Sequence, residues 1–257
     1  HKIMAITIKS EREIELMAEA GKILERVHNE LEKALRPGMS TKDIDTLGEE
    51  IIRSYGCIPS FLNYNGYPAS ICVSVNQEVV HGIPDKHRII QEGDIVSLDA
   101  GVIYKGYHSD AARTHAVGEV SEEAKKLIQV TKESFFEGIK FAKAGNHLFD
   151  ISGAIGRYAE ERGYGVVRDL CGHGIGTALH EAPEIPNYEV GRKGVRLRPG
   201  MTLAIEPMIN IGTHEVDWLD DDWTVVTRDG SLSAHYENTI LITEGEPRIL
   251  SLTCENE

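Results

Sequence analysis

Residues 95–110 read IVSLDAGVIYKGYHSD, an apolar run that reaches a carboxylate at Asp99, turns, and returns to a second carboxylate at Asp110. The pair Lys105-Gly106 predicts a tight turn between two strands, because glycine readily adopts the positive φ that hairpin turns need. A loop of two or four residues places Asp99 opposite Ala112 on the returning strand. Side chains alternate along a strand with a period of two, so we expect Asp99 and Asp110 on one face as diagonal neighbours.

Two carboxylates on one face of an apolar hairpin repel each other and are costly to remove from water. A divalent cation is a better partner for such a pair than a single proton. The hairpin therefore predicts a metal site. The alternative is that the hairpin lies at the periphery, where Asp99 and Asp110 are simply solvated.

The composition is that of a soluble globular protein, with 257 residues, 41% hydrophobic and 26% charged. This length allows one large domain or two small ones. The chain has 41 acidic and 27 basic residues, a net charge of −14. This charge argues against specificity for nucleic acid and against binding to an anionic membrane. No apolar run approaches a membrane span and no signal peptide is visible, so a cytoplasmic protein is expected.

The cysteines Cys57, Cys72, Cys171 and Cys254 are scattered and form no Cys-x-x-Cys pair. This spacing disfavours a disulfide framework and a structural zinc site, and it fits a reducing cytosol. We interpret residues 1–3 as an addition ahead of a native start at Met4.

Capping and stop signals predict four helices, from Ser10 to about Leu35, Ile44 to Ser54, Ser121 to about Lys143, and Asp150 to Arg162. Strands and loops are expected over residues 61–80, 95–117, 169–176, 201–210, 223–227 and 231–243. Asp229-Gly230 predicts a hairpin turn between the last two of these segments.

The order of elements repeats in the second half of the chain. A shift of 107 positions places Gly38 on Gly145, Asp43 on Asp150, Ile44 on Ile151, Gly56 on Gly163, Gly93 on Gly200, Leu98 on Ile205 and Asp99 on Glu206. We interpret this constant offset as an internal duplication, with halves at about 9–117 and 121–250 inside a single catalytic domain that spans 4–257. Two similar halves that share one site would bring Asp99 and Glu206 together.

The second half offers further carboxylates beside apolar strands. Glu206 ends the apolar run 201–205 and precedes Pro207, which often marks the end of a strand. Glu237 lies just before the apolar run 239–242. Either glutamate alone is more often a solvated strand end than a ligand. Together with the aspartates of the hairpin they strengthen the case for a metal site.

His173 lies in the glycine-rich run CGHGIG at residues 171–176. Glycines on both sides let the backbone approach a neighbour closely and hold the imidazole in an unusual pose. The run lacks the Gly-Lys-Ser/Thr of a phosphate loop, His180-Glu181-Ala182-Pro183-Glu184 is not a His-Glu-x-x-His zinc motif, and no Gly-x-Ser-x-Gly occurs. Carboxylates with one imidazole and no thiolate suit a pair of first-row divalent ions that share a bridging water.

These motifs, taken in order, resemble the methionine aminopeptidases of the pita-bread fold. They are the two aspartates eleven positions apart, CGHGIG at 171–176, AIEP at 204–207 and YENT at 236–239. The resemblance runs from about Ser10 to Leu250 and looks like the short bacterial form, type I. It implies an α+β fold with two pseudo-symmetric halves and a curved antiparallel sheet covered by helices. It also implies a metalloexopeptidase that removes the N-terminal methionine from nascent polypeptides with a small second residue.

The resemblance implies the metal ligands Asp99, Asp110, His173, Glu206 and Glu237. Asp110 and Glu237 would bridge two divalent ions, with Asp99 completing one and His173 with Glu206 the other. The ions would be manganese, iron, cobalt or zinc, and a hydroxide that bridges them would attack the methionyl carbonyl.

Other residues take roles from the same resemblance. His81 matches the histidine near the scissile amide, His180 the one that steadies the tetrahedral intermediate, and Glu206 the proton shuttle. Alone, each histidine would be an ordinary loop residue, and the surrounding motifs favour the functional interpretation. Asn76 and Ser233 match backbone positions of a monovalent cation site in some members of the family.

The resemblance also implies a methionine pocket. Its expected residues are Phe61, Tyr64, Tyr67, Cys72, His81, Leu179, His180 and Trp223. Phe61 stands where a cysteine is common in the family, and Leu179 where a phenylalanine is common. Both remain apolar, so selectivity for methionine should survive while the shape of the pocket and its inhibitor preference change.

Two alternatives differ from this hypothesis in kind. A proline-directed peptidase or creatinase relative shares the fold and the ligand types, but such proteins usually carry an extra N-terminal domain. A binding module could keep the fold and lose the chemistry, although all five ligands and both histidines are present. The expected partners are N-terminal methionyl peptides and nascent chains, with transient ribosome association, and we expect a monomer.

Overall fold

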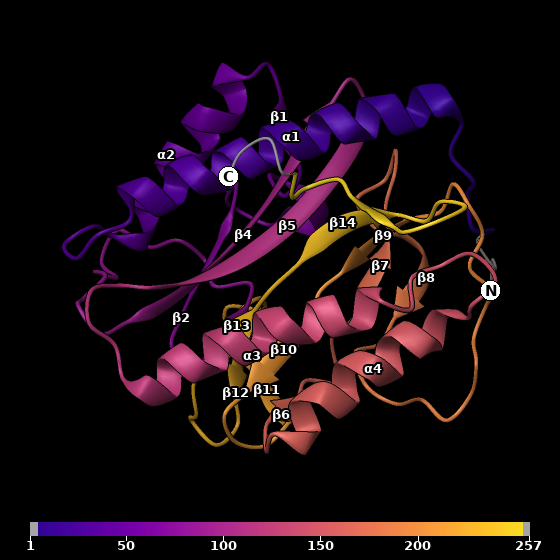
Figure 1. Ribbon diagram of the computed structural model, residues 1–257. Coiled ribbons are helices and arrows are strands. Elements are labelled where there is room, and N and C mark those ends of the chain that lie inside the picture. Colours follow the sequence, from indigo (N-terminus) through magenta and orange to yellow (C-terminus); the bar gives the residue numbers. More distant parts are fainter. Residues whose placement is uncertain (1–4, 254–257) are drawn as a thin grey trace.

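Helices cover a curved antiparallel sheet in the computed structural model, which describes residues 5–253 (Figure 1). The helices are α1 (Glu11–Ala34), α2 (Thr41–Ser54), α3 (Glu122–Ile139) and α4 (Leu148–Glu161), with a short 3-10 helix η1 (Tyr64–Gly66). Ser10, Ser40 and Ser121 cap α1, α2 and α3 by accepting a hydrogen bond from a backbone N–H in the first turn. With Ser40 as its cap, α2 begins at Thr41 rather than at Ile44 as expected. The expected addition at residues 1–3, the start at Met4, and Cys254 lie outside the described residues.

One helix ends earlier than expected. α3 stops at Ile139 rather than near Lys143. Beyond Ile139 the hydrogen bonds span three residues instead of four. The Phe141 N–H donates to Gly138 O at 3.1 Å, and the Ala142 N–H donates to Ile139 O at 3.0 Å. Such three-residue hydrogen bonds are a common way to satisfy the last carbonyls of a helix.

The strands are short apart from one central pair. They are β1 (Ile58–Pro59), β2 (Cys72–Val75), β3 (Glu78–Val80), β4 (Ile95–Tyr104), β5 (Tyr107–Ala116), β6 (Gly165–Val166), β7 (Gly172–Gly174), β8 (Glu181–Ile185), β9 (Thr202–Ile205), β10 (Met208–Asn210), β11 (Val216–Trp218), β12 (Val225–Thr227), β13 (Ser233–His235), β14 (Asn238–Leu241) and β15 (Arg248–Ile249). Within the described residues, they pair in the orders β1-β4-β2 with β5 on β4, β13-β10-β6, β11-β12-β3 and β15-β14-β9-β7-β8.

The central pair is the hairpin predicted from residues 95–110. β4 and β5 are antiparallel, with Asp99 opposite Ala112 as expected. Lys105 and Gly106 form the turn with φ values of 46° and 87°, and positive φ at both central residues is the mark of a turn that matches strand twist. The register confirms that Asp99 and Asp110 are diagonal neighbours on one face.

The prediction of a hairpin at Asp229-Gly230 is wrong. A turn does form there, but β12 pairs with β3 and β11 while β13 pairs with β10. Asp229 Oδ2 accepts a hydrogen bond from the Thr213 N–H at 2.9 Å. This contact holds the turn against the β10–β11 connection, so the flanking strands separate into different sheets.

The two halves of the chain have matching elements. α2 and α4 begin 107 positions apart, at Thr41 and Leu148, and β4 and β9 do the same, at Ile95 and Thr202. The glycines at the expected equivalent positions share their backbone conformation, with φ of 95° and 93° for residues 38 and 145, and 96° and 94° for residues 93 and 200. These correspondences support the duplication that we propose for this single domain.

Each pair of helices covers its own part of the sheet. α1 packs on β4, β5 and α2, whereas α3 packs on α4, β10 and β13 (Figure 1). The larger core cluster of the first half lies under α1 and α2, and that of the second half under α3 and α4. Within residues 5–253, no helix combines the length and hydropathy that crossing a membrane requires.

Hydrogen bonds join the two halves along β5. Ala112 and Glu237 form an antiparallel bridge, and Arg113 Nη2 donates to Asn238 Oδ1 at 2.7 Å. The Asp110 N–H donates to Thr239 Oγ1 at 2.9 Å. This seam places carboxylates from both halves beside each other in the middle of the molecule.

A close approach at α1 gives a first testable prediction. A Cβ on Gly21 would lie 2.0 Å from the backbone oxygen of Leu250, so we expect Gly21→Ala to lower the free energy of unfolding by about 1–3 kcal/mol. Urea denaturation measures this change. The control is Gly153→Ala in α4, where the added Cβ meets only the ends of the exposed Arg157–Glu189 pair. It should be neutral or stabilise by up to about 1 kcal/mol, and an equal loss in both variants would contradict the prediction.

Candidate metal centre and substrate pocket

The expected metal ligands come from segments far apart in the sequence and meet in one place. Asp99 lies on β4, Asp110 on β5 and His173 on β7, while Glu206 follows β9 and Glu237 precedes β14. Ligand atoms of Asp110, His173, Glu206 and Glu237 all lie within 4.8 Å of one another. Asp99 and Glu237 form a second such group, with His235 as its third member. Glu237 belongs to both groups, as a bridging carboxylate would.

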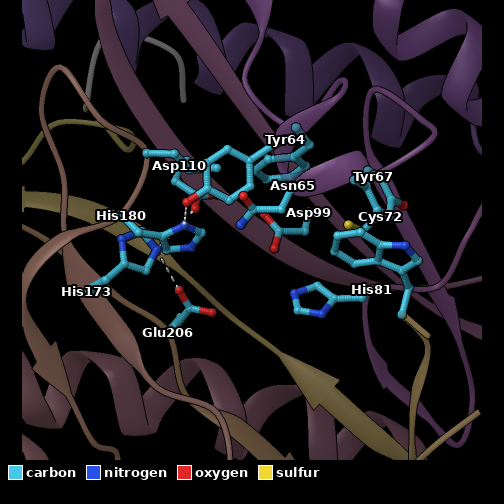
Figure 2. Close-up of a pocket in the computed structure, with 13 residues that line it drawn as sticks. Tyr64, Asn65, Tyr67, Cys72, His81, Asp99, Asp110, His173, His180 and Glu206 are labelled. Carbon is cyan, nitrogen blue, oxygen red and sulfur yellow. Dashed lines mark hydrogen bonds and ion pairs between the residues drawn. The ribbon is translucent and has the colours of Figure 1, made fainter.

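The glycines around His173 allow tight packing of β7 between its neighbours. A Cβ on Gly172 would lie 2.3 Å from Ala204 O on β9, and one on Gly174 would lie 2.1 Å from Ala182 O on β8. Either methyl group would push the strands apart. The predicted close approach is therefore to adjacent strands, and it directs the imidazole of His173 toward the carboxylates (Figure 2).

The imidazole of His173 is oriented for metal binding through Nε2. Its Nδ1 lies 2.9 Å from Gly174 O, which can only accept, so Nδ1 carries the hydrogen. In the neutral ring the lone pair is then on Nε2, which lies 3.2 Å from Glu206 Oε2 and 3.5 Å from Asp110 Oδ2. A ligating histidine that donates its other nitrogen to a carbonyl is a common arrangement at metal sites.

The carboxylates are buried without enough positive charge around them. The side chain of Glu237 is 0% exposed, and no described group makes a hydrogen bond with either of its oxygens, with Asp99 Oδ1 or with Asp110 Oδ1. Burial, followed by the charge of Asp110, raises the pKa of Asp99 and of Glu237 well above the ordinary values. Unpaired buried carboxylates are costly. The donor set and its unmet charge therefore fit divalent cations bound between them.

In Glu206 and His173, by contrast, neighbouring groups favour the charged form. Burial favours the neutral form of Glu206, but contacts with His173 and His235 outweigh it and hold the pKa of Glu206 well below its usual range. Burial also disfavours the charged form of His173, yet Asp110 and Glu206 raise the pKa of His173 to about 10. An imidazolium held among carboxylates shows how strongly the site favours a positive charge at this position.

A pocket of about 230 Å³ opens beside the carboxylates, with a polar wall and an apolar one. It is lined by every residue expected for the methionine pocket, namely Phe61, Tyr64, Tyr67, Cys72, His81, Leu179, His180 and Trp223, together with Asn65, Asp99, Asp110, His173 and Glu206 (Figure 2). The rings of Tyr67 and Trp223 meet edge to face, with centroids 5.1 Å apart. Burial, followed by the charge of Asp99, raises the pKa of the Cys72 thiol well above its usual value, so this side chain stays neutral as part of the wall.

His81 occupies a strained backbone conformation at the pocket. Its φ is 59°, in the left-handed region that non-glycine residues rarely adopt. The next residue, Gly82, approaches β2 so closely that a Cβ would lie 2.2 Å from Val73 O. Such outliers are found disproportionately at functional sites, where the surrounding structure holds them in place.

His180 is held by a tyrosine from the other half of the chain. Its Nδ1 lies 2.7 Å from Tyr64 Oη, and its ring lies against that of His173, with centroids 4.2 Å apart. Burial, followed by the charge of His173, lowers the pKa of His180 to about 4. The imidazole is therefore neutral at neutral pH, and its hydrogen is on Nε2 when Tyr64 donates to Nδ1.

The residues expected near a monovalent cation also lie together. The Ser233 N–H donates to Asn76 O at 3.1 Å, and Asn76 Oδ1 accepts from the Ile95 N–H at 3.0 Å. Asn76 has a φ of 57°, which turns its backbone between β2 and β3. The cation itself stays a prediction.

Sequence reasoning missed two residues of this region, His235 and Asn65. His235 precedes Glu237 by two positions, so the period-two alternation of an extended chain places both side chains on one face. That alternation was the available signal. Asn65 lies in η1 with a φ of 50°, and only the Tyr-Asn-Gly sequence around it indicated a turn.

Comparisons with known proteins agree with this geometry. Residues 15–244 match the model of metallopeptidase family M24. A methionine aminopeptidase of Clostridium acetobutylicum is 58% identical over 250 residues, which cover 97% of this chain and 100% of that protein. The crystal structure of a methionine aminopeptidase from Thermotoga maritima has a TM-score of 0.95 at 47% identity, covering 97% of this chain and 100% of that one. An Xaa-Pro dipeptidase from Bacillus anthracis has a TM-score of 0.76 at 28% identity, and the match covers 96% of this chain but 62% of that protein. The pita-bread fold is thereby confirmed.

Proposed function

This chain belongs to the methionine aminopeptidases of metallopeptidase family M24, and on that premise we propose that it removes the N-terminal methionine from peptides with a small second residue. The observation that carries the proposal is that a candidate metal site and a substrate-sized pocket lie side by side. A cluster of buried carboxylates with one imidazole forms one wall of a pocket whose other wall is aromatic and apolar. The size of the pocket and its aromatic and thiol lining suit an unbranched thioether.

We assign the metal ligands as the resemblance implies. Asp110 and Glu237 would hold both of two divalent ions, Asp99 one of them, and His173 with Glu206 the other. Such a pair of ions supplies a hydroxide near neutral pH and polarises a carbonyl oxygen. Manganese, iron, cobalt and zinc all suit this ligand set.

The protein groups around the pocket take complementary roles. The side chain of the methionine would lie against Tyr67, Cys72 and Trp223, with the scissile peptide beside His81 and His180. The Nε2–H of His180 would donate to the carbonyl oxygen as negative charge develops there. Glu206 would act as the proton shuttle, as the resemblance implies.

Peptide hydrolysis with two substrates tests the proposal. The protein loaded with Mn²⁺ or Co²⁺ is expected to release methionine from Met-Ala-Ser and to leave an Ala-Pro dipeptide intact, as measured by chromatography of the products. Activity on the Ala-Pro substrate alone would favour the proline-directed alternative and overturn our choice. Metal binding without hydrolysis of either peptide would favour the binding module.

The metal itself is expected to stabilise the fold. A cation that binds the native state at a concentration of about 100 times its Kd adds about 2.7 kcal/mol, which corresponds to a rise in Tm of roughly 5–10 °C for a domain of this size. Differential scanning fluorimetry with Mn²⁺, before and after chelation, measures the shift. Asp110→Ala should abolish it, and an unchanged shift in that variant would place the bound ion elsewhere.

A further inference from the structure

His235 is a buried histidine at the metal cluster that is not among the proposed ligands. It is the last residue of β13 and is 1% exposed. Its Nε2 lies 3.4 Å from Glu206 Oε1, on the side of the carboxylate opposite to the contact with His173. The same imidazole lies near Asp99 and Glu237, in the second cluster of candidate ligand atoms.

The backbone of His235 is held from two directions. The Thr114 hydroxyl of β5 accepts a hydrogen bond from the His235 N–H at 2.8 Å and lies 2.9 Å from the His235 carbonyl oxygen, to which it donates. On the other side His235 pairs with Met208 of β10. Because Thr114 of the first half and Met208 of the second half hold this backbone from two sides, the imidazole has a defined place beside Glu206.

The two oxygens of Glu206 face two different histidines, the proposed ligand His173 and the non-ligand His235. Oε2 lies 3.2 Å from His173 Nε2, and the Nδ1 hydrogen of that ring is engaged by Gly174 O at 2.9 Å. The space between Oε2 and Nε2 therefore suits a positive charge, either the proton of the imidazolium or a metal ion that replaces it. Oε1 lies 3.4 Å from His235 Nε2, and this buried nitrogen has no hydrogen-bond partner among the described residues. It is therefore available to donate to Oε1.

We propose that His235 is a positioning residue that donates from Nε2 to Glu206 Oε1 and turns the other oxygen, Oε2, toward the metal ion shared with His173. This inference rests on the proposed metal site. The separation of 3.4 Å is longer than a typical hydrogen bond, and such contacts often shorten when the site is filled. Groups that support a ligating carboxylate commonly change metal affinity by about 10–100-fold when they are removed.

The test compares replacements at residue 235 that differ in reach and in hydrogen-bonding capacity. His235→Gln keeps an N–H donor at a similar distance, His235→Asn keeps an amide that is too short, and His235→Leu removes the donor. The full-length protein is stripped of metal and titrated with Co²⁺ by calorimetry, and the visible absorption of the Co²⁺ complex is recorded. Neither readout requires hydrolysis of a peptide. Failure of the proposed peptidase activity would thus be distinguishable from failure of this inference.

We expect His235→Leu and His235→Asn to weaken Co²⁺ binding by about 10–100-fold and to alter the absorption bands, whereas His235→Gln stays within about threefold of the wild type. His115→Leu is the matched control, since it removes a partly buried imidazole of β5 whose Nδ1 lies 3.8 Å from Glu32 rather than at the metal cluster. Wild-type affinity and spectrum in His235→Asn would overturn the proposal even if His235→Leu failed to fold. Loss of binding in the glutamine variant would also overturn it, because it would require the imidazole itself as a ligand.

Discussion

Replacing Glu237 with glutamine is expected to stabilise the metal-free protein while it abolishes metal-dependent activity. The side chain of Glu237 is 0% exposed, and within the described residues neither of its oxygens has a hydrogen-bond partner. A glutamine at this position is neutral without having to take up a proton, so we expect the free energy of unfolding without metal at neutral pH to rise by on the order of 1–3 kcal/mol. Activity with metal should fall by roughly 10⁴-fold, as when one member of a catalytic unit is lost.

The pH dependence of stability gives the same prediction a second readout. Burial, followed by the charge of Asp110, raises the pKa of Glu237 above its ordinary value. The native state therefore holds a proton that the unfolded state has released, so the metal-free wild type should lose stability as pH rises above about 4.5. Urea denaturation from pH 5 to 8 should show a steeper loss in the wild type than in Glu237→Gln.

An exposed glutamate provides the control for Glu237→Gln. Glu244→Gln removes one negative charge from the surface and should change neither the metal-free stability nor the activity by a measurable amount. If Glu237→Gln lowered the metal-free stability instead, the carboxylate would have to make a stabilising contact in the apo protein. The account of an uncompensated charge cluster would then be wrong.

The parts of the site that could be predicted from the sequence depend on local rules. The turn at Lys105-Gly106 and the period of two along a strand place Asp99 and Asp110 on one face without knowledge of the rest of the fold. Glu206 could be reached through the offset of 107 from Asp99, because similar halves place similar residues at their shared interface. These inferences used only information about residues close in the sequence or about the internal repeat.

The parts that could not be predicted depend on pairings between distant segments. The dipeptide Asp229-Gly230 indicates a turn, but it does not say which strands pair beyond it, and here β12 and β13 join different sheets. His235 faces Glu206 only because β13 pairs with β10 and is held by Thr114 of β5. A sequence pattern identifies a polar residue there, whereas the contact follows from three strands that meet.

The second large effect is expected at His180, where alanine should reduce kcat by about 10²–10³-fold with little change in KM. The hydroxyl of Tyr64 lies 2.7 Å from Nδ1 of His180. If Tyr64 donates to that nitrogen, the hydrogen of the neutral ring is on Nε2, where it can stabilise the developing oxyanion. Steady-state kinetics with Met-Ala-Ser measures the loss. Tyr64→Phe leaves the imidazole in place but removes the hydroxyl that favours the tautomer with its hydrogen on Nε2. We therefore expect a smaller loss in kcat, of about tenfold.

The protonation state of His180 separates this role from that of a general acid. Burial, followed by the charge of His173, lowers the pKa of His180 to about 4, and divalent cations nearby would lower it further. The ring therefore stays neutral above about pH 5, and the acidic limb of the pH profile for kcat should be no different in Tyr64→Phe. His87→Ala, at an exposed loop histidine, is the control and should retain full activity. A kcat for His180→Ala within about threefold of the wild type would contradict oxyanion stabilisation, since one lost donor typically costs about 2.7–4 kcal/mol in such sites.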